Sequence, residues 1–566
     1  MPQKKKLLIG EMLIERKLVT ADELDQALKE QRNTGEFVGR VLIKLGHLTE
    51  EELLPILSEQ LGIEYVSLKA VKIDKSIAKT IPAKFVTHYK IMPVKLEGNM
   101  LTIAMTDPLD INVLDDIKLL LGHDIRPVFA SEKDITDTLN KYYGVGAETI
   151  ESMMSNSPAS ALKAGSKTSN ITDLSEDASI IKFVNQILNQ AVRDRATDIH
   201  IEPYENELKV RFRIDGVLYD ANIPPTIKHF QSALVSRIKI MADLNIAERR
   251  LPQDGRMKIK IENEEVDMRV SILPTPFGES VDLRILKSGV LWDIERLGFF
   301  KDDMKLLEDL IKRPHGIIFV TGPTGSGKTT TLYACLNKIN KHDKKIITIE
   351  DPIEYQINNV TQIQIHPKIG LTFAQGLRSM LRHDPDIMMV GEVRDFETAE
   401  ITIRFALTGH LVFSTIHTND AAGGVTRLLD MGIEPYLVSS SVECFVAQRL
   451  VRLICDNCKR EAKPSQAILE EVGLKKAIGK IYEGAGCDKC KFTGYRGRTA
   501  IFELLIIDDE IRQMILKRTS SNEIKKLAVS KGMKTLRDDG LHKVMEGLTT
   551  IAEVIRVTQQ NERPLE

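Results

Sequence analysis

The segment Gly322–Thr329 constrains the fold most, because Gly-Pro-Thr-Gly-Ser-Gly-Lys-Thr fits the pattern G-x-x-x-x-G-K-[ST] in full. The apolar run Gly316–Thr321 before it predicts a buried strand, and the run from Thr329 predicts a helix. Glycines let backbone N–H groups converge on phosphate oxygens, and the helix N-terminus adds the positive end of its dipole. The segment therefore predicts a phosphate-binding loop between a strand and a helix.

Two residues of this loop have distinct chemical tasks. Lys328 places a point charge on the β- and γ-phosphate oxygens, and the Thr329 hydroxyl is available to Mg²⁺. The pattern implies ATP and Mg²⁺ as cofactors. The predicted nucleotide-binding residues are Gly322, Pro323, Thr324, Gly325, Ser326, Gly327, Lys328 and Thr329.

Short apolar runs alternate with helical stretches on both sides of the loop. This alternation predicts a mostly parallel sheet with helices between its strands. The runs expected to form strands are Ile317–Thr321, Ile346–Glu350, Ile387–Val390 and Leu411–Thr415.

Carboxylates follow two of these strands, at the sheet edge where parallel sheets bind ligands. Asp386–Glu392 ends in Glu392, which can hold Mg²⁺ directly or through water. Ile349–Glu354 contains three carboxylates within five residues, and one of them can orient the attacking water. The alternative, that these are capping or solvated acids, is less favoured because they occur together after parallel strands.

Together with two further segments, these features make residues 178–566 resemble the secretion ATPase superfamily, the hexameric motors of type II secretion and type IV pilus assembly. The resemblance implies a multidomain α/β fold. A RecA-like P-loop domain is preceded by an α+β (PAS-like) domain, with an N-terminal helical-repeat α/β domain and a tetracysteine zinc subdomain. The matching motifs are the Walker A loop Gly322–Thr329, the Asp box Ile347–Tyr355, the Walker B segment Ile387–Asp395 and the His box Thr408–Asn419.

The resemblance implies roles for five residues of these motifs. Glu350 and Glu354 fall in the Asp box, where the family's catalytic glutamate lies, and Glu354 is slightly favoured. Glu392 falls on the Walker B glutamate, which handles Mg²⁺. His410 and His417 fall in the His box, which senses the γ-phosphate and couples it to motion.

The family also uses arginines near the transferred phosphoryl group. Arg269 and Arg284 match a pair in the domain before the motor, and Arg378 and Arg382 match a second pair. Their physical task is to neutralise charge on that group. The alternative for each arginine is a structural ion pair.

The domain before the motor also contains Leu251–Arg256 and the alternating polar residues Asp198, His200 and Glu202, in segments that resemble this superfamily. Alternation places the three polar side chains on one face of a strand. A metal site is one interpretation, and a hydrogen-bonded domain interface is preferred.

Four of the six cysteines form two Cys-x-x-Cys pairs separated by 28 residues. This spacing is typical of a four-thiolate structural zinc site without an open position for catalysis. A redox dithiol is the alternative, but it would need no second pair. In the family, extension motors commonly have this insert and retraction motors lack it. The expected ligands are Cys455, Cys458, Cys487 and Cys490.

The first sixty residues contain a repeat with a period of 29, in which Gly10 and Gly39 correspond. Thr20/Glu23 and Thr49/Glu52 predict two capping boxes before amphipathic helices. The unit resembles the N-terminal module of related ATPases, some of which bind cyclic di-GMP through Arg-Leu-Gly motifs. Here Leu8 and Phe37 stand at the arginine positions, which removes charge-assisted contacts. A docking domain for a membrane-anchored partner is therefore favoured over cyclic di-GMP binding.

The whole chain has 566 residues with a formal net charge of −2, which indicates several domains and no nucleic-acid substrate. No apolar run approaches the roughly 18 residues that a membrane span needs, so a cytoplasmic location is expected. The expected domains are an N-terminal docking domain (1–143, with repeats at 10–60), a flexible linker (144–177), an α+β domain (178–290) and the ATPase domain (291–566), with its zinc subdomain at about 452–498.

The function expected from the resemblance is a hexameric cytoplasmic ATPase at the inner face of the bacterial inner membrane. It would act with an inner-membrane platform protein and a cytoplasmic or membrane-anchored adaptor to assemble a pilus or pseudopilus. Gly424–Pro435 and Ser439–Leu453 look closer to type II secretion motors, with a type IV pilus assembly ATPase as the alternative. A non-hydrolytic nucleotide or cyclic di-GMP sensor is a further alternative. A DNA-pumping relative is disfavoured because no basic stripe is present.

Overall fold

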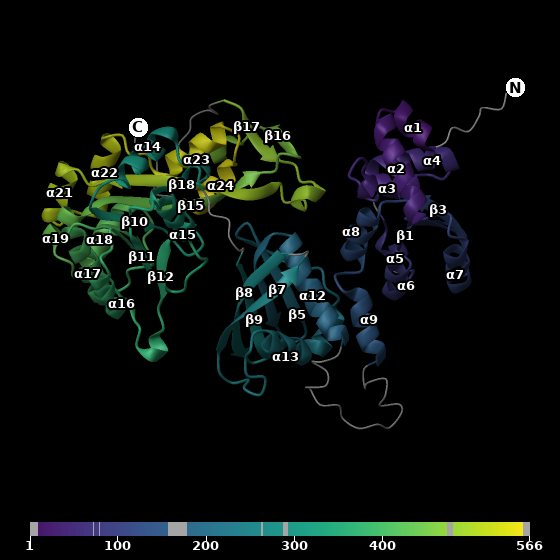
Figure 1. The fold of residues 1–566 in the computed structure, drawn as a ribbon, viewed down its shortest axis with the longest axis horizontal. Coiled ribbons are helices and arrows are strands. Elements are labelled where there is room, and N and C mark those ends of the chain that lie inside the picture. Colours follow the sequence, from purple (N-terminus) through teal and green to yellow (C-terminus); the bar gives the residue numbers. More distant parts are fainter. Residues whose placement is uncertain are drawn as a thin grey trace. The chain divides into compact units, whose positions relative to one another are not determined.

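The computed structural model describes residues 9–71, 73–78, 80–156, 178–261, 264–286, 293–472 and 479–558. The chain divides into two compact units, Met1–Ile285 and Leu286–Glu566. Among the described residues, no helix is both long enough and apolar enough to cross a membrane. Figure 1 shows the elements in sequence colours.

The N-terminal repeat folds as two copies of a short helix followed by a longer one. The helices are α1 (Ile9–Glu15), α2 (Ala21–Thr34), α3 (Val38–Lys44) and α4 (Glu50–Leu61), and both predicted capping boxes are present. A Cβ atom added at Gly10 or Gly39 would lie 2.8 Å from Leu24 or Leu53, so the short helix crosses closely over the longer one in each copy. Leu8 lies outside the described residues.

A small mixed sheet follows these helices. Strand β1 (Ile91–Glu97) pairs antiparallel with β2 (Met100–Met105), which pairs in parallel with β3 (Asp124–Phe129). The surrounding helices are α5 (Lys75–Ala78), α6 (Ala83–His88), α7 (Ile111–Leu121) and α8 (Glu132–Tyr142).

The predicted flexible linker is wrong over Ala147–Asn156, which forms helix α9. Ile150 and Met153 are 2% and 4% exposed and belong to the same buried cluster as Phe183 of helix α12 (Ala178–Arg193). Burial of these apolar side chains offsets the low helix propensity of the surrounding serines. The rest of the predicted linker, residues 157–177, lies outside the described residues.

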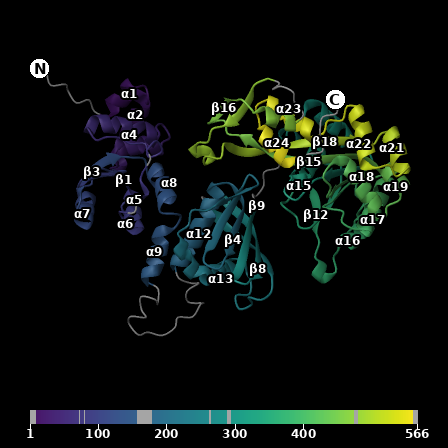
Figure 2. The same cartoon turned by 180° about the vertical axis from the view of Figure 1, so that it is seen from behind.

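Residues 178–286 form a six-stranded sheet in the order β6-β5-β4-β9-β8-β7. Helices α12 and α13 (Gln231–Met241) lie against this sheet in Figure 2, and the buried core contains apolar side chains of both helices and of the strands. The strands are β4 (Ala196–Pro203), β5 (Leu208–Ile214), β6 (Val217–Asp220), β7 (Gln253–Ile261), β8 (Glu264–Thr275) and β9 (Gly278–Leu286).

The second unit is built on a seven-stranded sheet in the order β12-β11-β13-β14-β10-β15-β18. All neighbours are parallel except β15 and β18, which are antiparallel. The four predicted strands are present as β10, β11, β13 and β14. The strands are β10 (Gly316–Thr321), β11 (Ile346–Glu350), β12 (Val360–Gln364), β13 (Ile387–Val390), β14 (Leu411–Ile416), β15 (Val442–Ile454) and β18 (Tyr495–Ile506).

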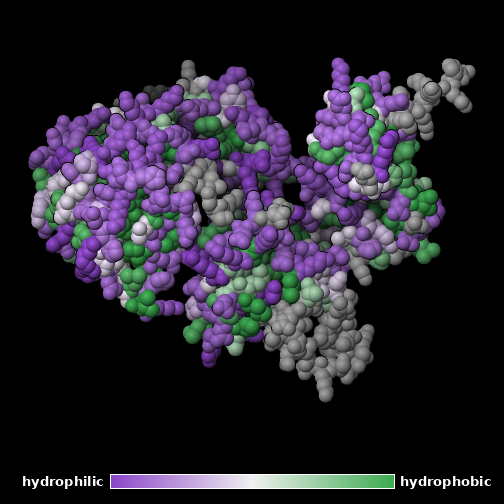
Figure 3. Space-filling view, viewed as in Figure 1, coloured by the Kyte–Doolittle hydropathy of each residue, from purple (hydrophilic) through white to green (hydrophobic). Residues whose placement is uncertain are grey.

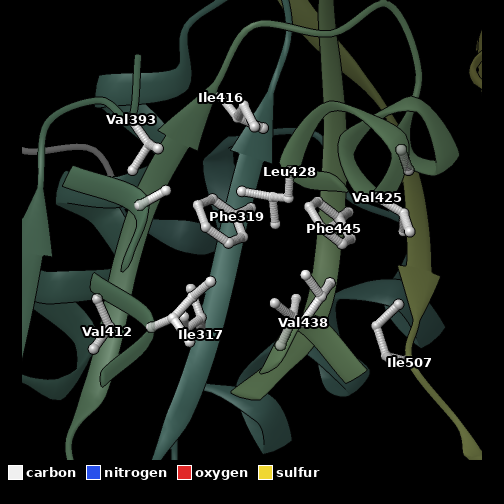
Figure 4. Packing of buried hydrophobic residues seen from close by; sticks show 14 of the residues in the cluster. Ile317, Phe319, Val393, Val412, Ile416, Val425, Leu428, Val438, Phe445 and Ile507 are labelled. Atoms are coloured by element: carbon white, nitrogen blue, oxygen red, sulfur yellow. The ribbon is translucent and has the colours of Figure 1, made fainter. Parts of the chain in front are cut away.

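Both faces of this sheet are buried by helices. Ile317 and Phe319 of β10 pack with α16 to α19 on one face, where the Phe319 and Phe445 rings stack at 5.4 Å (Figure 4). Ile318 and Val320 pack with α14 and α15 on the other face. The face of the molecule shown in Figure 3 is mainly hydrophilic over this unit, as expected for helices that shield a sheet. The helices are α14 (Lys301–Leu310), α15 (Lys328–Ile339), α16 (Phe373–Met380), α17 (Phe396–Leu407), α18 (Ala421–Asp430) and α19 (Pro435–Ser441).

The cysteine segment is inserted between β15 and β18. It contains the two-stranded sheet β16 (Lys459–Ala462) and β17 (Ile481–Gly484). Helices α21 (Asp509–Leu516), α22 (Ser521–Ser530), α23 (Leu536–Met545) and α24 (Ile551–Val557) follow β18. Glu553 of α24 pairs with Arg452 of β15 at 2.7 Å, so the last described helix is bonded to the strand that leads into the insert.

Candidate active site

The phosphate loop lies between β10 and α15, as the sequence predicts. Gly322, Gly325 and Gly327 have φ values of +147°, +79° and +90°, which lie in a region that favours glycine. The buried hydroxyls of Thr321 and Ser326 have no hydrogen-bond partner in the described structure. A loop with left-handed glycines and unsatisfied buried hydroxyl groups fits a phosphate ligand.

Lys328 opens α15 beside this loop. Its Nζ atom donates to the carbonyl oxygens of Gly322 at 2.9 Å and Pro323 at 3.1 Å. The pKa of Lys328 is lowered to about 8, mainly by burial, while the charge of Glu392 raises it and that of Arg449 lowers it. The loop therefore holds a lysine whose ammonium group is stabilised by added negative charge, such as that of a phosphate.

Four neighbouring parallel strands bring the predicted motifs to one edge of the sheet. The order β11-β13-β14-β10 places the ends of the Asp-box, Walker B and His-box strands next to the loop. The hydroxyls of Ser414 and Thr415 donate to the carbonyls of Val390 and Gly391 at 2.8 and 2.7 Å, which fixes the backbone before Glu392.

Glu392 connects the Walker B and His-box segments. Its side chain is 12% exposed, pairs with Arg394 at 2.6 Å and lies 3.5 Å from Nε2 of His417. The negative charge of Glu392 also raises the pKa of Lys328. Glu392 therefore forms one cluster beside the loop with Lys328, Arg394 and His417. Such a cluster can hold a hydrated Mg²⁺ ion together with a phosphate.

The two histidines of the predicted His box lie at opposite ends of β14. His417 follows the strand at the edge with the loop, whereas His410 precedes it, level with the start of β10. Six strand residues separate their backbones by roughly 20 Å. Nδ1 of His410 lies 3.0 Å from the Phe405 carbonyl oxygen and 3.1 Å from Oγ1 of Thr408. The structure therefore brings His417, and not His410, to the loop of the same chain.

The two Asp-box glutamates have different surroundings. Glu350 is 3% exposed and accepts hydrogen bonds from Tyr333, Thr348 and Gln362. Burial raises the pKa of Glu350, while these hydrogen bonds lower it. Glu354 is half-buried in the turn after β11. The geometry thus favours Glu354 as the more accessible carboxylate.

The predicted arginines belong to different parts of the structure. Arg378 pairs with Glu397, and Arg382 donates to the carbonyl oxygen of Arg378 at 3.1 Å, so both stay at the exposed surface of α16 and the turn after it. In the first unit, Arg284 donates to Asp198 at 2.8 Å, and Arg269 lies on β8. Their roles at the phosphate stay predictions.

The alternating residues of β4 are bonded to side chains of β4 and of the neighbouring strands. Asp198 bonds to Thr197 and Arg284, Glu202 bonds to Arg211 at 2.7 Å, and His200 lies 3.3 Å from Asp282. Among the described residues, these three side chains do not belong to a cluster that could hold a metal ion. The structure agrees with a hydrogen-bonded sheet face.

The four predicted cysteine ligands converge. Their sulfur atoms all lie within 4.8 Å of one another. Cys455–Cys487 and Cys458–Cys490 are separated by 3.8 Å, and Cys487–Cys490 by 3.7 Å. A tetrahedron with Zn–S bonds of about 2.3 Å has S···S edges of about 3.8 Å. Backbone N–H groups of Cys487 and Gly494 donate to the Cys490 sulfur at 3.1 and 3.3 Å, as expected around thiolates.

The sequence reasoning did not identify Tyr333, which contacts the Asp box, or Gln448 and Arg449, which lie beside the loop. Strand β15 continues past its last pairing with β10, so Gln448 and Arg449 flank the loop. Gln448 accepts from Thr331 at 2.8 Å, and Arg449 donates to the Asn419 carbonyl at 3.0 Å. The adjacent polar pair directly after the apolar run Cys444–Ala447 was the sequence signal for both.

Comparison with known proteins assigns the chain to a family. The family described as Type II/IV secretion system protein matches residues 173–556, and the MshEN domain matches residues 61–149. The Type IV pilus assembly ATPase PilB of Myxococcus xanthus is 44% identical over 556 residues, covering 97% of this chain and 98% of that protein. The Type II secretion system protein E of Xanthomonas campestris is 42% identical over 565 residues, covering 97% and 98%.

A solved structure supports the fold. The X-ray structure of the Legionella pneumophila ATPase DotB has a TM-score of 0.50 and 21% identity, and the match covers 66% of this chain and 95% of that chain. The resemblance that the four motifs indicate is confirmed, and the chain belongs to the type II/IV secretion system protein family.

Proposed function

We propose that this chain hydrolyses ATP to power the assembly of a pilus or pseudopilus, and that the type II secretion system is its setting. The observation that carries the proposal is the convergence of Lys328, Glu392 and His417 at the carboxyl edge of the sheet. The relatives named for type II secretion and for type IV pilus assembly match almost the whole chain, so pilus assembly is the second candidate.

The residues of the site have separate tasks in the proposed hydrolysis of ATP. The loop N–H groups and Lys328 bind the β- and γ-phosphates. Thr329 and Glu392 are the groups that would hold Mg²⁺, which offsets charge on the phosphates when bound. Glu354 orients the attacking water, and His417 reports the state of the γ-phosphate through Glu392. Arg269, Arg284, Arg378 and Arg382 neutralise charge on the phosphoryl group.

The cysteine cluster holds a structural Zn²⁺ in this proposal. Its sulfur separations match the edges of a zinc–thiolate tetrahedron, and four protein ligands leave no position for a substrate. The metal would thus stabilise the insert between β15 and β18.

We further propose a cytoplasmic homo-hexamer at the inner membrane, acting on a platform protein through an adaptor bound by the N-terminal domain. The sheet domain at 178–286, with helices on one face, supports a PAS-like domain, and the paired helices α1–α4 support a repeat module. Cyclic di-GMP binding is disfavoured because Phe37, which is 77% exposed, replaces an arginine of the binding motif.

A deletion strain tests the function and separates its two settings. The strain is complemented with the wild-type chain or with Lys328→Ala, then scored for secreted enzymes and for surface pili. Loss of secretion with normal pili, restored only by the wild type, supports type II secretion. Loss of pili with normal secretion assigns the chain to pilus assembly, and loss of neither contradicts the proposal.

A further inference from the structure

A largely buried polar cluster, in and beside the Asp box, joins three elements of the second unit. It consists of Tyr333 from α15, Thr348 and Glu350 from β11, and Gln362 from β12. Figure 1 shows these three elements in the same part of the second unit. Thr348 and Glu350 share one face of β11, and Gln362 is paired with Thr348 in the sheet. The nucleotide chemistry described above uses none of Tyr333, Thr348 and Gln362.

Glu350 is the centre of this cluster. Oε1 accepts from Thr348 at 2.5 Å and from Gln362 at 3.1 Å, and Oε2 accepts from the Tyr333 hydroxyl. Three donors satisfy a carboxylate that is 3% exposed. A carboxylate engaged in this way is poorly suited to bind and turn a water molecule.

The same cluster fixes the turn that contains Glu354. The backbone N–H of Glu354 donates to the Tyr333 hydroxyl at 3.4 Å. Gln362 accepts from the Ile357 N–H at 2.8 Å and donates to the Tyr355 carbonyl at 3.2 Å. Two side chains thus hold the backbone on both sides of Tyr355.

Tyr333 also connects this turn to the phosphate loop. It lies five residues after Lys328 on α15, is fully buried, and its ring lies edge-on to Tyr355 at 4.6 Å. A displacement of the turn relative to the loop would break its contacts to both Glu350 and Glu354.

We propose that Tyr333 and Gln362 are positioning residues that hold Glu354 at a fixed position relative to the phosphate loop. Both donate hydrogen bonds to the buried Glu350, which fixes their own positions. This inference rests on the proposed function, because it takes Glu354 as the group that orients the attacking water. An error of about 1 Å in such a group costs on the order of a hundredfold in rate.

The test compares Tyr333→Phe, Gln362→Leu and Glu354→Gln in the full chain, by single-turnover hydrolysis and by binding of a non-hydrolysable ATP analogue. Tyr333→Phe and Gln362→Leu should each lower the hydrolysis rate by about 10- to 100-fold and change the dissociation constant by less than about twofold. The control, Tyr495→Phe, removes a hydroxyl that bonds to Thr550 at 2.8 Å near the cysteine insert, and should keep the wild-type rate.

A double variant distinguishes a positioning role of Tyr333 from a general destabilisation of the protein. In the Glu354→Gln background, Tyr333→Phe should lower the rate by less than about threefold, because the group that it positions is already absent. The inference is overturned if Tyr333→Phe lowers the hydrolysis rate as much in the Glu354→Gln background as in the wild type. It is also overturned if Tyr333→Phe weakens binding of the ATP analogue as much as it lowers the rate. If Tyr333→Phe hydrolyses ATP at the wild-type rate while Glu354→Gln is inactive, the inference is overturned but the role proposed for Glu354 stands. A wild-type rate for Glu354→Gln overturns the role proposed for Glu354 and the inference with it.

Discussion

Thr331 on the loop helix donates a hydrogen bond of 2.8 Å to the side-chain oxygen of Gln448 on β15. Both side chains are buried, with exposures of 1% and 2%. A Cβ atom added at Gly327 would lie 2.9 Å from Nε2 of the same glutamine. This hydrogen bond therefore ties the helix after the phosphate loop to the strand that flanks the loop.

Thr331→Val should destabilise the second unit by about 1–3 kcal/mol, because it leaves the buried Gln448 oxygen without a donor. The double variant Thr331→Val with Gln448→Leu removes both polar groups and should recover most of that loss. Urea unfolding of the full chain, followed by circular dichroism, measures both. If the double variant is less stable than the single one, this hydrogen bond is not the cause of the loss.

Lys328 makes nucleotide affinity depend on pH. Its pKa of about 8 in the structure means that the charged, phosphate-binding form predominates below pH 8. Bound phosphate stabilises that form, so affinity should be constant below pH 8 and fall by up to about tenfold per pH unit above it. Titration with a fluorescent ATP analogue from pH 6.5 to 9.5 measures this dependence.

Lys328→Arg is the matched control for that titration. Its side chain keeps its charge throughout this range, so its affinity should not fall above pH 8, whatever its absolute value. A wild-type affinity that stays constant to pH 9.5 would exclude a lowered pKa for this lysine.

His417→Ala should lower the hydrolysis rate at least about tenfold more than His410→Ala, because only His417 reaches Glu392 in the same chain. Single-turnover hydrolysis compares the two variants. Equal losses, or a larger loss for His410→Ala, would mean that the opposite edge of β14 also takes part, through a neighbouring subunit.

The cysteine cluster should bind one Zn²⁺ per chain. Cys458→Ser and Cys490→Ser should each lose the metal measured by elemental analysis, since three thiolates bind more weakly than four. Cys335→Ala changes a buried cysteine outside the cluster and should retain the metal. Retention of full zinc by both serine variants would argue against a four-thiolate site.

The strands around the loop could be predicted because each one is buried on both faces. Such strands are continuous apolar runs in sequence, which is why β10, β11, β13 and β14 matched the prediction. Their order in the sheet then brings Glu392 and His417 together. The predicted strand β14 also separates His410 from His417. Because both histidines were assigned to one motif, their positions at opposite ends of this strand were not recognised from the sequence.

The contacts of Tyr333 and Gln448 could not be predicted in the same way. Each is a buried polar side chain whose partner lies far away in the sequence, 117 residues in the case of Thr331 and Gln448. Local periodicity contains no information about such a partner. Helix α9 was missed for a related reason, because its stability comes from packing on α12 rather than from its own residues.

Phosphate release by the purified full chain tests the central claim most directly. Lys328→Ala should lower turnover by at least about a hundredfold, because it removes the charge that meets the β- and γ-phosphates. Lys338→Ala, on the same helix but paired with Glu295 and Glu308, should keep wild-type turnover. Equal turnover by Lys328→Ala and the wild type would contradict ATP hydrolysis at this site.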